Sequence, residues 1–84
     1  MDETNPLLGK EIKKIVRNQI KQNDPPETKQ TYDRLIKEGF PKDEAMRQLA
    51  VVVAAEIYDV MKNNEPFNQE RFIKMLNNLP TEPE

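Results

Sequence analysis

The side chain with the most chemical potential is a glutamate in an apolar context. Glu56 follows the run Val51-Val52-Val53-Ala54-Ala55 and precedes Ile57-Tyr58. Burial raises the pKa of a carboxyl group, and such a group can serve as a general acid, a base or a metal ligand. The structural alternative is stronger, because buried charges are nearly always paired. Glu56 then either emerges at the edge of a bundle or pairs with a Lys or Arg, for example from the N-terminal helix.

A second candidate is a row of basic residues near the N-terminus, which we call the basic stripe. It consists of Lys10, Lys14, Arg17 and Lys21. Spacings of three and four residues place these cations on one face of a helix, with Lys13 at the border. Such a face is suited to phosphates or to an acidic partner, although solvated charge is what the outer face of a helix normally carries. No aromatic residue interleaves with the stripe, so stacking on single-stranded bases is not indicated.

Several residue types that carry chemistry are absent. The chain has no His and no Cys, and Ser does not occur in it. Thiolate metal sites, Glu-x-x-His ligand pairs and the usual nucleophile–base pairs are therefore excluded. Gly9 and Gly39 stand alone, so there is no glycine-rich phosphate loop. We expect no enzymatic activity, no cofactor, no metal and no small-molecule substrate.

Four helices are predicted to position these residues. The first begins after Asn5-Pro6, an N-cap residue followed by proline. Spacings of three and four residues predict its inward face, which consists of Leu8, Ile12, Ile15, Val16, Gln19 and Ile20. The second is expected from Pro25 to Glu38, with a capping box of Asp24 and Glu27 and a left-handed Gly39 after it. The third runs from about Lys42 to Asn63, and a short fourth helix is capped by Asn68. The predicted fold is all-α, a compact bundle of four helices around one long central helix.

The long third helix carries an apolar girdle. Its members are Val51, Val52, Val53, Ala54, Ile57 and Met61. The segment from Leu49 to Ala55 is apolar on every face, which predicts that neighbouring helices surround it. Any part of the girdle that they leave uncovered would be an apolar patch of the kind that marks a partner site. Val52 and Met61 are the candidate positions for such an interface, and a homodimer is the simplest partner.

The turn around Gly39 permits two further interpretations. In a DNA-binding helix-turn-helix, the second helix would begin with Asp43 and Glu44, whose charges would repel the DNA backbone. The same stretch is similar to a ubiquitin-associated domain at Gly39-Phe40 and Ala45. A helix of that family would break within a dozen residues, whereas the predicted helix here continues past Tyr58.

Size and charge set the remaining limits. The 84 residues are expected to form one domain, residues 1–84, with a core over about residues 5–79 and flexible ends at 1–4 and 80–84. The net charge of −2 makes nucleic acid an unlikely partner, because phosphate neutralisation dominates such binding. The longest apolar run, Leu49 to Ala55, is far shorter than the roughly 20 residues that span a bilayer. No export signal is apparent, and we expect a cytoplasmic protein without a membrane segment.

A set of short motifs in order carries a family resemblance. They are Asn5-Pro6, Val16-Arg17-Asn18-Gln19, Asp24-Pro25-Pro26-Glu27, Arg34-Leu35, Glu38-Gly39, Glu44-Ala45 and Glu56-Ile57. Together they resemble an uncharacterised family of small bacterial helical domains of unknown function, over residues 5–80. Its relatives often carry histidines on the first and third helices, and this chain has none. The resemblance thus implies a fold and no activity.

The favoured hypothesis is therefore a non-enzymatic interaction or regulatory module that binds an unknown protein or a second copy of itself. The alternative is a nucleic-acid-associated protein that uses the basic stripe.

Overall fold

The computed structural model describes residues 6–80, and describes side chains from residue 9 onward. Its elements follow the order α1 (Pro6–Gln22), α2 (Pro26–Lys37), α3 (Lys42–Asn63) and α4 (Gln69–Asn77). The predicted all-α fold of four helices around one long helix is confirmed. The predicted N-cap Asn5 and the ends at residues 1–4 and 81–84 lie outside the described residues, as does the side chain of Leu8.

The ends of the helices follow from local chemistry. Gly39 has a φ of +104°, and Asn23 and Asn64, which follow α1 and α3, also have positive φ. Glycine and asparagine tolerate this region best, so they stop helices without much strain. Asn68 is confirmed as the N-cap of α4, because its side chain accepts a hydrogen bond from the Arg71 N–H at 2.9 Å.

The predicted capping box of α2 is wrong. Pro25 occupies the N-cap and makes no side-chain cap hydrogen bond. The N–H of Asp24 instead donates to the Gln19 carbonyl at 3.0 Å, so Asp24 belongs to the turn that closes α1. Proline at the first helical position supplies a preset φ in place of the cap.

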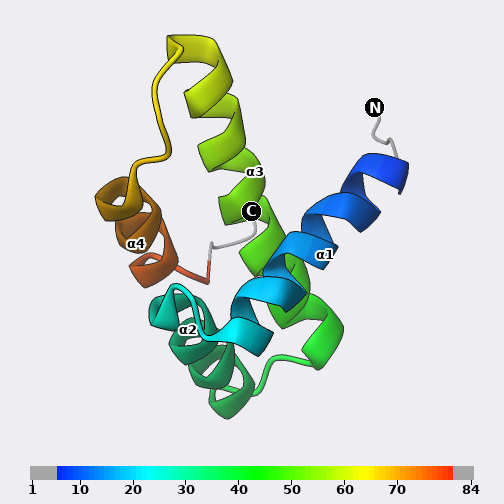
Figure 1. Ribbon diagram of the computed structural model, residues 1–84. Helices are drawn as coiled ribbons and strands as arrows, with labels where there is room; N and C mark the ends of the chain where they lie inside the picture. Colours follow the sequence, from blue (N-terminus) through cyan, green and yellow to red (C-terminus); the bar gives the residue numbers. More distant parts are fainter. Residues whose placement is uncertain (1–5, 81–84) are drawn as a thin grey trace.

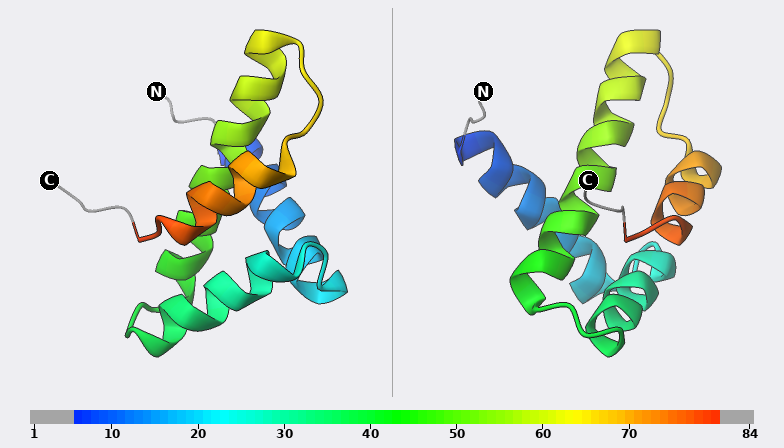
Figure 2. Two further views of the ribbon diagram at one scale, coloured as in Figure 1. Left: turned by 90° about the vertical axis from the view of Figure 1, so that its left-hand side faces the viewer. Right: turned by 180° about the vertical axis from the view of Figure 1, so that it is seen from behind.

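Helix α3 is the centre of the molecule. Figures 1 and 2 show α1 and α4 on opposite sides of α3, with α2 beneath them. Helix α3 contacts α1, α2 and α4, and α2 also contacts α1 and α4. Each helix contributes to one core of buried apolar side chains: Val16, Leu35, Ala45, Leu49, Val52, Val53, Phe72, Leu76 and Leu79.

Two polar contacts hold the outer helices to α2. The buried Thr28 hydroxyl donates to the Gln19 side-chain oxygen at 2.9 Å, which joins α2 to α1. The Arg34 guanidinium donates to the carbonyls of Leu76 and Leu79 at 3.1 and 2.9 Å. Leu76 lies in the last turn of α4 and Leu79 lies just beyond it, so Arg34 both caps the C-terminal end of α4 and fixes it to α2.

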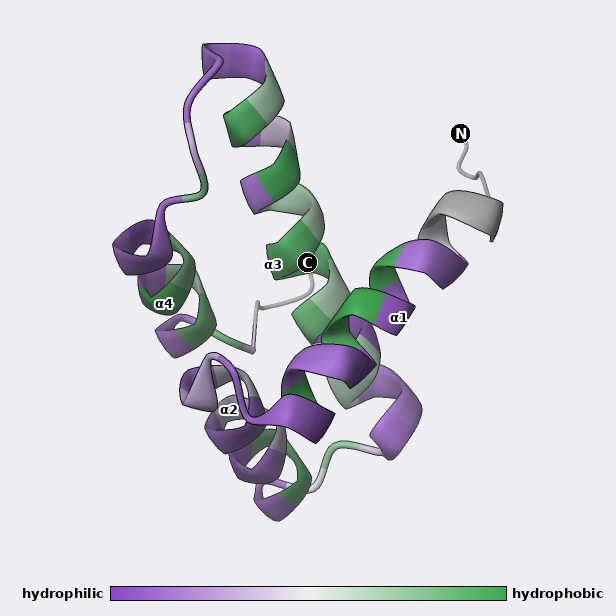
Figure 3. Ribbon diagram, in the orientation of Figure 1, coloured by the Kyte–Doolittle hydropathy of each residue, from purple (hydrophilic) through white to green (hydrophobic). Residues whose placement is uncertain are grey.

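The prediction that neighbouring helices surround the segment from Leu49 to Ala55 on every face is wrong at Val51, and part of the apolar girdle beyond this segment is uncovered. Val51 is 46% exposed, Ile57 is 38% exposed and Met61 is 76% exposed, while Val52 and Val53 are buried. Three shorter helices do not encircle a helix of 22 residues, which is about 33 Å long. Figure 1 shows the C-terminal end of α3 projecting beyond α1 and α4, and Figure 3 shows hydrophobic residues continuing along this end.

Among the described residues, no helix has both the length and the apolar character needed to cross a membrane.

Candidate functional site

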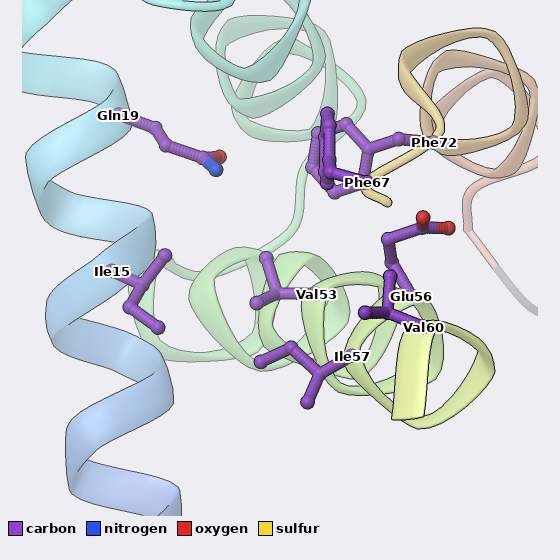
Figure 4. Close-up of a pocket in the computed structure, with 8 residues that line it drawn as sticks. All are labelled: Ile15, Gln19, Val53, Glu56, Ile57, Val60, Phe67 and Phe72. Carbon is purple, nitrogen blue, oxygen red and sulfur yellow. The ribbon is translucent and has the colours of Figure 1, made fainter. Parts of the chain in front are cut away.

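An open groove lies over α3, between α1 and the segment that leads into α4. It has a volume of about 270 Å³ and is lined by Ile15, Gln19, Val53, Glu56, Ile57, Val60, Phe67 and Phe72. Figure 4 shows Ile15 and Gln19 on α1 facing Val53 and Ile57 on α3, with the two phenylalanines on a third side. The lining is apolar apart from Gln19 and Glu56.

The groove exists because α1 and α4 are held apart. Within the described part of the chain, α1 contacts α2 and α3 but not α4. The buried Val16 faces the core, whereas Ile15, one position earlier, turns about 100° around the helix toward the groove. Helical spacing predicted Ile15 on the inward face of its helix, but its side chain is 39% exposed because no described residue closes this side.

Exposed apolar residues gather at this groove. The described residues include seven large apolar side chains that are exposed: Ile15, Ile36, Val51, Ile57, Tyr58, Met61 and Phe67. Ile15, Ile57 and Phe67 line the groove, and Met61 lies one helical turn beyond Ile57 on the same face of α3. These four side chains therefore form an exposed apolar surface at and beside the groove.

Phe67 is positioned by a local motif that the sequence analysis missed. It immediately precedes the N-cap Asn68, and its ring packs on Phe72 with centroids 5.4 Å apart and planes tilted by 53°. Apolar residues just before the N-cap and at the fourth helical position form a hydrophobic staple. The Phe-Asn-x-x-x-Phe spacing is the signal that could have revealed this wall of the groove.

Glu56 is 2% exposed and lies at the end of the groove nearest α4. Arg71 of α4 donates to both carboxylate oxygens, from Nε to Oε1 and from Nη2 to Oε2, each at 2.9 Å. The backbone N–H of Asn68 donates to Oε2 at 2.8 Å. Glu56 is thus paired, and its partner lies on α4 rather than on the N-terminal helix that the sequence analysis suggested.

This environment decides the charge of the carboxylate. The hydrogen bonds from Arg71 lower the pKa of Glu56, burial opposes them, and the Asn68 N–H lowers the pKa further. The same contacts with Glu56 raise the pKa of the Arg71 guanidinium. Glu56 therefore remains an anion held in place, without the raised pKa that a general acid requires.

Arg71 also gathers the nearby acidic residues. Its Nε lies 3.7 Å from an Asp59 oxygen, and its Nη1 lies 3.6 Å from a Glu65 oxygen. A guanidinium in the middle of three carboxylates occupies the place that a cation would need. Among the described residues, no group of three or more metal-ligating side chains is arranged to hold an ion. The arrangement fastens α4 and its preceding loop to α3.

The other candidate residues are spread over the surface. The four cations of the basic stripe are all exposed on α1, and helical geometry places them on the side turned away from Ile15 and the groove. Val52 is 4% exposed and belongs to the core, so it offers no interface, whereas Met61 is exposed. At the start of α3, Glu44 accepts hydrogen bonds from Arg47 and Gln48, which lower its pKa to about 2.

Fold and groove together define the class: a small all-helical domain with an open apolar groove beside a buried ion pair. A family model described as Domain of unknown function (DUF1841) matches residues 1–78. The chain belongs to this family, which confirms the resemblance to a helical family of unknown function. No curated protein matches the chain, and no solved structure matches it.

Proposed function

We propose that this protein is a non-enzymatic interaction module, and that the apolar groove is its interface with a second copy of the chain. The observation that carries the proposal is the exposure of Ile15, Ile57 and Phe67 in the lining of one groove, with Met61 exposed one helical turn beyond Ile57. Burial of such side chains contributes about 1.5–3 kcal/mol each when it is complete. A surface of this kind gains most of its stabilisation when a matching apolar surface covers it.

The shape of the patch favours a second copy as the occupant. A two-fold dimer requires a surface that is complementary to itself, so that a protrusion on each copy enters a hollow on the other. Both features lie side by side here, because the groove is concave and the Met61 end of α3 projects beyond the other helices (Figure 1). In the proposed dimer, Met61 of each copy packs near Ile15 of the other.

The charges of the groove are compatible with this arrangement. A two-fold axis brings identical groups near one another, so an unpaired charge in the patch would repel its own copy. The one ionisable side chain in the lining is Glu56, and Arg71 neutralises it. The lining of the groove therefore brings no unpaired like charges together.

The test is the solution mass by multi-angle light scattering, measured over a range of protein concentrations at low and at high salt. An apolar interface predicts a dimer whose population depends on concentration but hardly on salt. Met61→Asp should return the protein to a monomer, because a carboxylate would be buried without a partner.

The matched control is Val51→Asp, since Val51 is an exposed apolar residue of α3 that does not line the groove. This variant should keep the mass of the wild type. Circular dichroism should show equal helix content in both variants. A monomer at every concentration would refute the proposal, and so would equal effects of the two substitutions.

A further inference from the structure

A second hollow lies on the other side of α1, where the basic stripe ends. It has a volume of about 470 Å³ and is lined by Arg17, Ile20, Lys21, Tyr32, Lys42 and Met46. Helices α1, α2 and α3 each contribute to it. We call it the basic pocket, and it shares no lining residue with the apolar groove.

The rim of the basic pocket is cationic. Arg17 and Lys21 on α1 and Lys42 at the start of α3 are all exposed. No acidic residue lines the pocket. Within the described residues the ion-paired cations are Lys29, Arg34, Arg47 and Arg71. Arg17, Lys21 and Lys42 therefore have no ion-pair partner among these residues. Three unpaired cations around one hollow create a local positive potential on a chain whose net charge is −2.

The floor of the basic pocket is apolar. Ile20, Tyr32 and Met46 are partly buried and pack against the core. The open faces of these side chains offer a site for an aliphatic group. Lys14 and Lys10 extend the row of cations along α1 from Arg17, at successive spacings of three and four residues. From Lys10 to Lys21 the row is roughly 16 Å long, because each helical residue adds about 1.5 Å.

We propose that the basic pocket and the adjoining basic stripe bind an acidic segment of another protein, with an aliphatic side chain of that segment in the pocket. The carboxylates of the segment would meet the cations of the rim and of the stripe. An apolar floor within a cationic rim fits a ligand that carries both kinds of group, and an amphipathic acidic segment does so.

Charge and floor together favour an acidic protein segment over nucleic acid. A nucleic acid has phosphates but no aliphatic group for Ile20 and Met46. The dense negative charge of a nucleic acid would also be repelled by the net negative charge of the whole chain. A short acidic segment interacts mainly with the nearby cations, because salt screens the more distant charges. This inference does not depend on the groove, and it remains testable in the monomeric Met61→Asp variant.

The experiment is an NMR titration of the ¹⁵N-labelled chain with a synthetic helix-forming peptide of glutamate and alanine with one central leucine. Shifts should concentrate at Ile20, Lys21, Tyr32 and Met46, and binding should weaken as salt is added. A peptide with serine in place of leucine should bind about fivefold more weakly, because the floor then gains no apolar contact.

Charge reversals test the rim. Arg17→Glu with Lys42→Glu should weaken binding of the leucine peptide by about tenfold or more. Lys37→Glu with Lys74→Glu is the matched control, since it reverses two exposed cations outside the pocket and should change the affinity little. Circular dichroism verifies that both variants fold.

Several outcomes would overturn the proposal. They are the absence of peptide binding, shifts that map to the apolar groove, and equal affinity for the serine peptide. Tighter binding of a single-stranded or duplex DNA oligonucleotide than of the leucine peptide would assign the surface to nucleic acid instead.

Discussion

Replacing Glu56 with Gln tests whether the buried ion pair fastens α4 to α3. The substitution keeps the size of the side chain and removes its charge. Glu56 accepts three hydrogen bonds of 2.8–2.9 Å, two from Arg71 and one from the Asn68 N–H. In Glu56→Gln, one end of the side chain becomes an NH₂ group, which donates and therefore opposes the Arg71 guanidinium.

We expect Glu56→Gln to lower the free energy of unfolding by about 2 kcal/mol at pH 7. This is the cost of losing a buried hydrogen bond to a charged group. The Glu56 side chain is 2% exposed, while the Arg71 side chain is 29% exposed, so solvent screens the pair only from the Arg71 side. For a domain of this size the loss lowers Tm by roughly 8–16 °C. Thermal and urea unfolding followed by circular dichroism would measure both quantities.

The pH dependence gives the same experiment a second readout. The folded-state pKa of Glu56 is lowered from its ordinary value of 4.5, so its carboxylate stabilises the fold fully above pH 4.5. That stabilisation is lost as pH falls below 4.5 through the folded-state pKa. The difference between wild type and Glu56→Gln should therefore be constant from pH 7 to about pH 5 and shrink at lower pH.

Glu65→Gln is the matched control. Glu65 also lies near Arg71, at 3.6 Å, but its side chain is 51% exposed. Exposed ion pairs contribute little, so we expect no measurable change in stability. Equal effects of the two substitutions, or a Glu56→Gln difference that does not change with pH, would show that the buried ion pair does not fasten α4 to α3.

Substitutions at Gly39, Gly9, Phe72 and Arg47 test helix ends, core packing and the hydrogen bonds of Glu44. Gly39→Ala should lower the free energy of unfolding in urea by about 1–2 kcal/mol, because the φ of Gly39 is +104°. Gly9 lies within α1 with open space around it, so Gly9→Ala should raise the free energy of unfolding by about 0.5 kcal/mol. Changes of the opposite sign would contradict these predictions. Phe72→Ala should cost about 3–5 kcal/mol, since its buried ring fills the core and packs on Phe67, and a loss below 1 kcal/mol would place Phe72 outside the core. NMR titration should give the Glu44 carboxyl a pKa near 2 in the wild type and a pKa closer to 4.5 in Arg47→Ala. The contribution of Glu44 to stability should be lost as pH falls from about 4.5 to about 2. An unchanged pKa in Arg47→Ala would show that Arg47 does not lower it.

Much of the fold could be predicted because its signals are local. Gly39, the Asn63-Asn64 break and the cap at Asn68 each act through their own backbone, so they fix helix ends whatever the tertiary packing. The apolar run of the third helix then identified Leu49, Val52 and Val53 as part of the core. The capping box at Asp24 failed because a proline two residues later supplied a different start for α2.

The groove and the ion pair were less predictable, because both depend on where α1 and α4 lie against α3. Sequence showed that Glu56 stands in an apolar segment, but Arg71 is 15 residues away on another helix, and no local signal links the two. Likewise, the apolar girdle is uniform in sequence, and only the placement of α1 and α4 decides that Val52 is buried while Met61 is exposed.

Disulfide cross-linking between two copies of the chain tests the proposed dimer at the contact between Ile15 and Met61. The chain has no cysteine, so a single one can be placed at will. Ile15→Cys and Met61→Cys proteins, mixed in equal amounts and oxidised mildly, should form a disulfide-linked heterodimer, because the proposed interface brings these positions together. A mixture of Ile15→Cys and Val51→Cys should not. No cross-link in the first mixture, or equal yields in both, would contradict a dimer built on the groove.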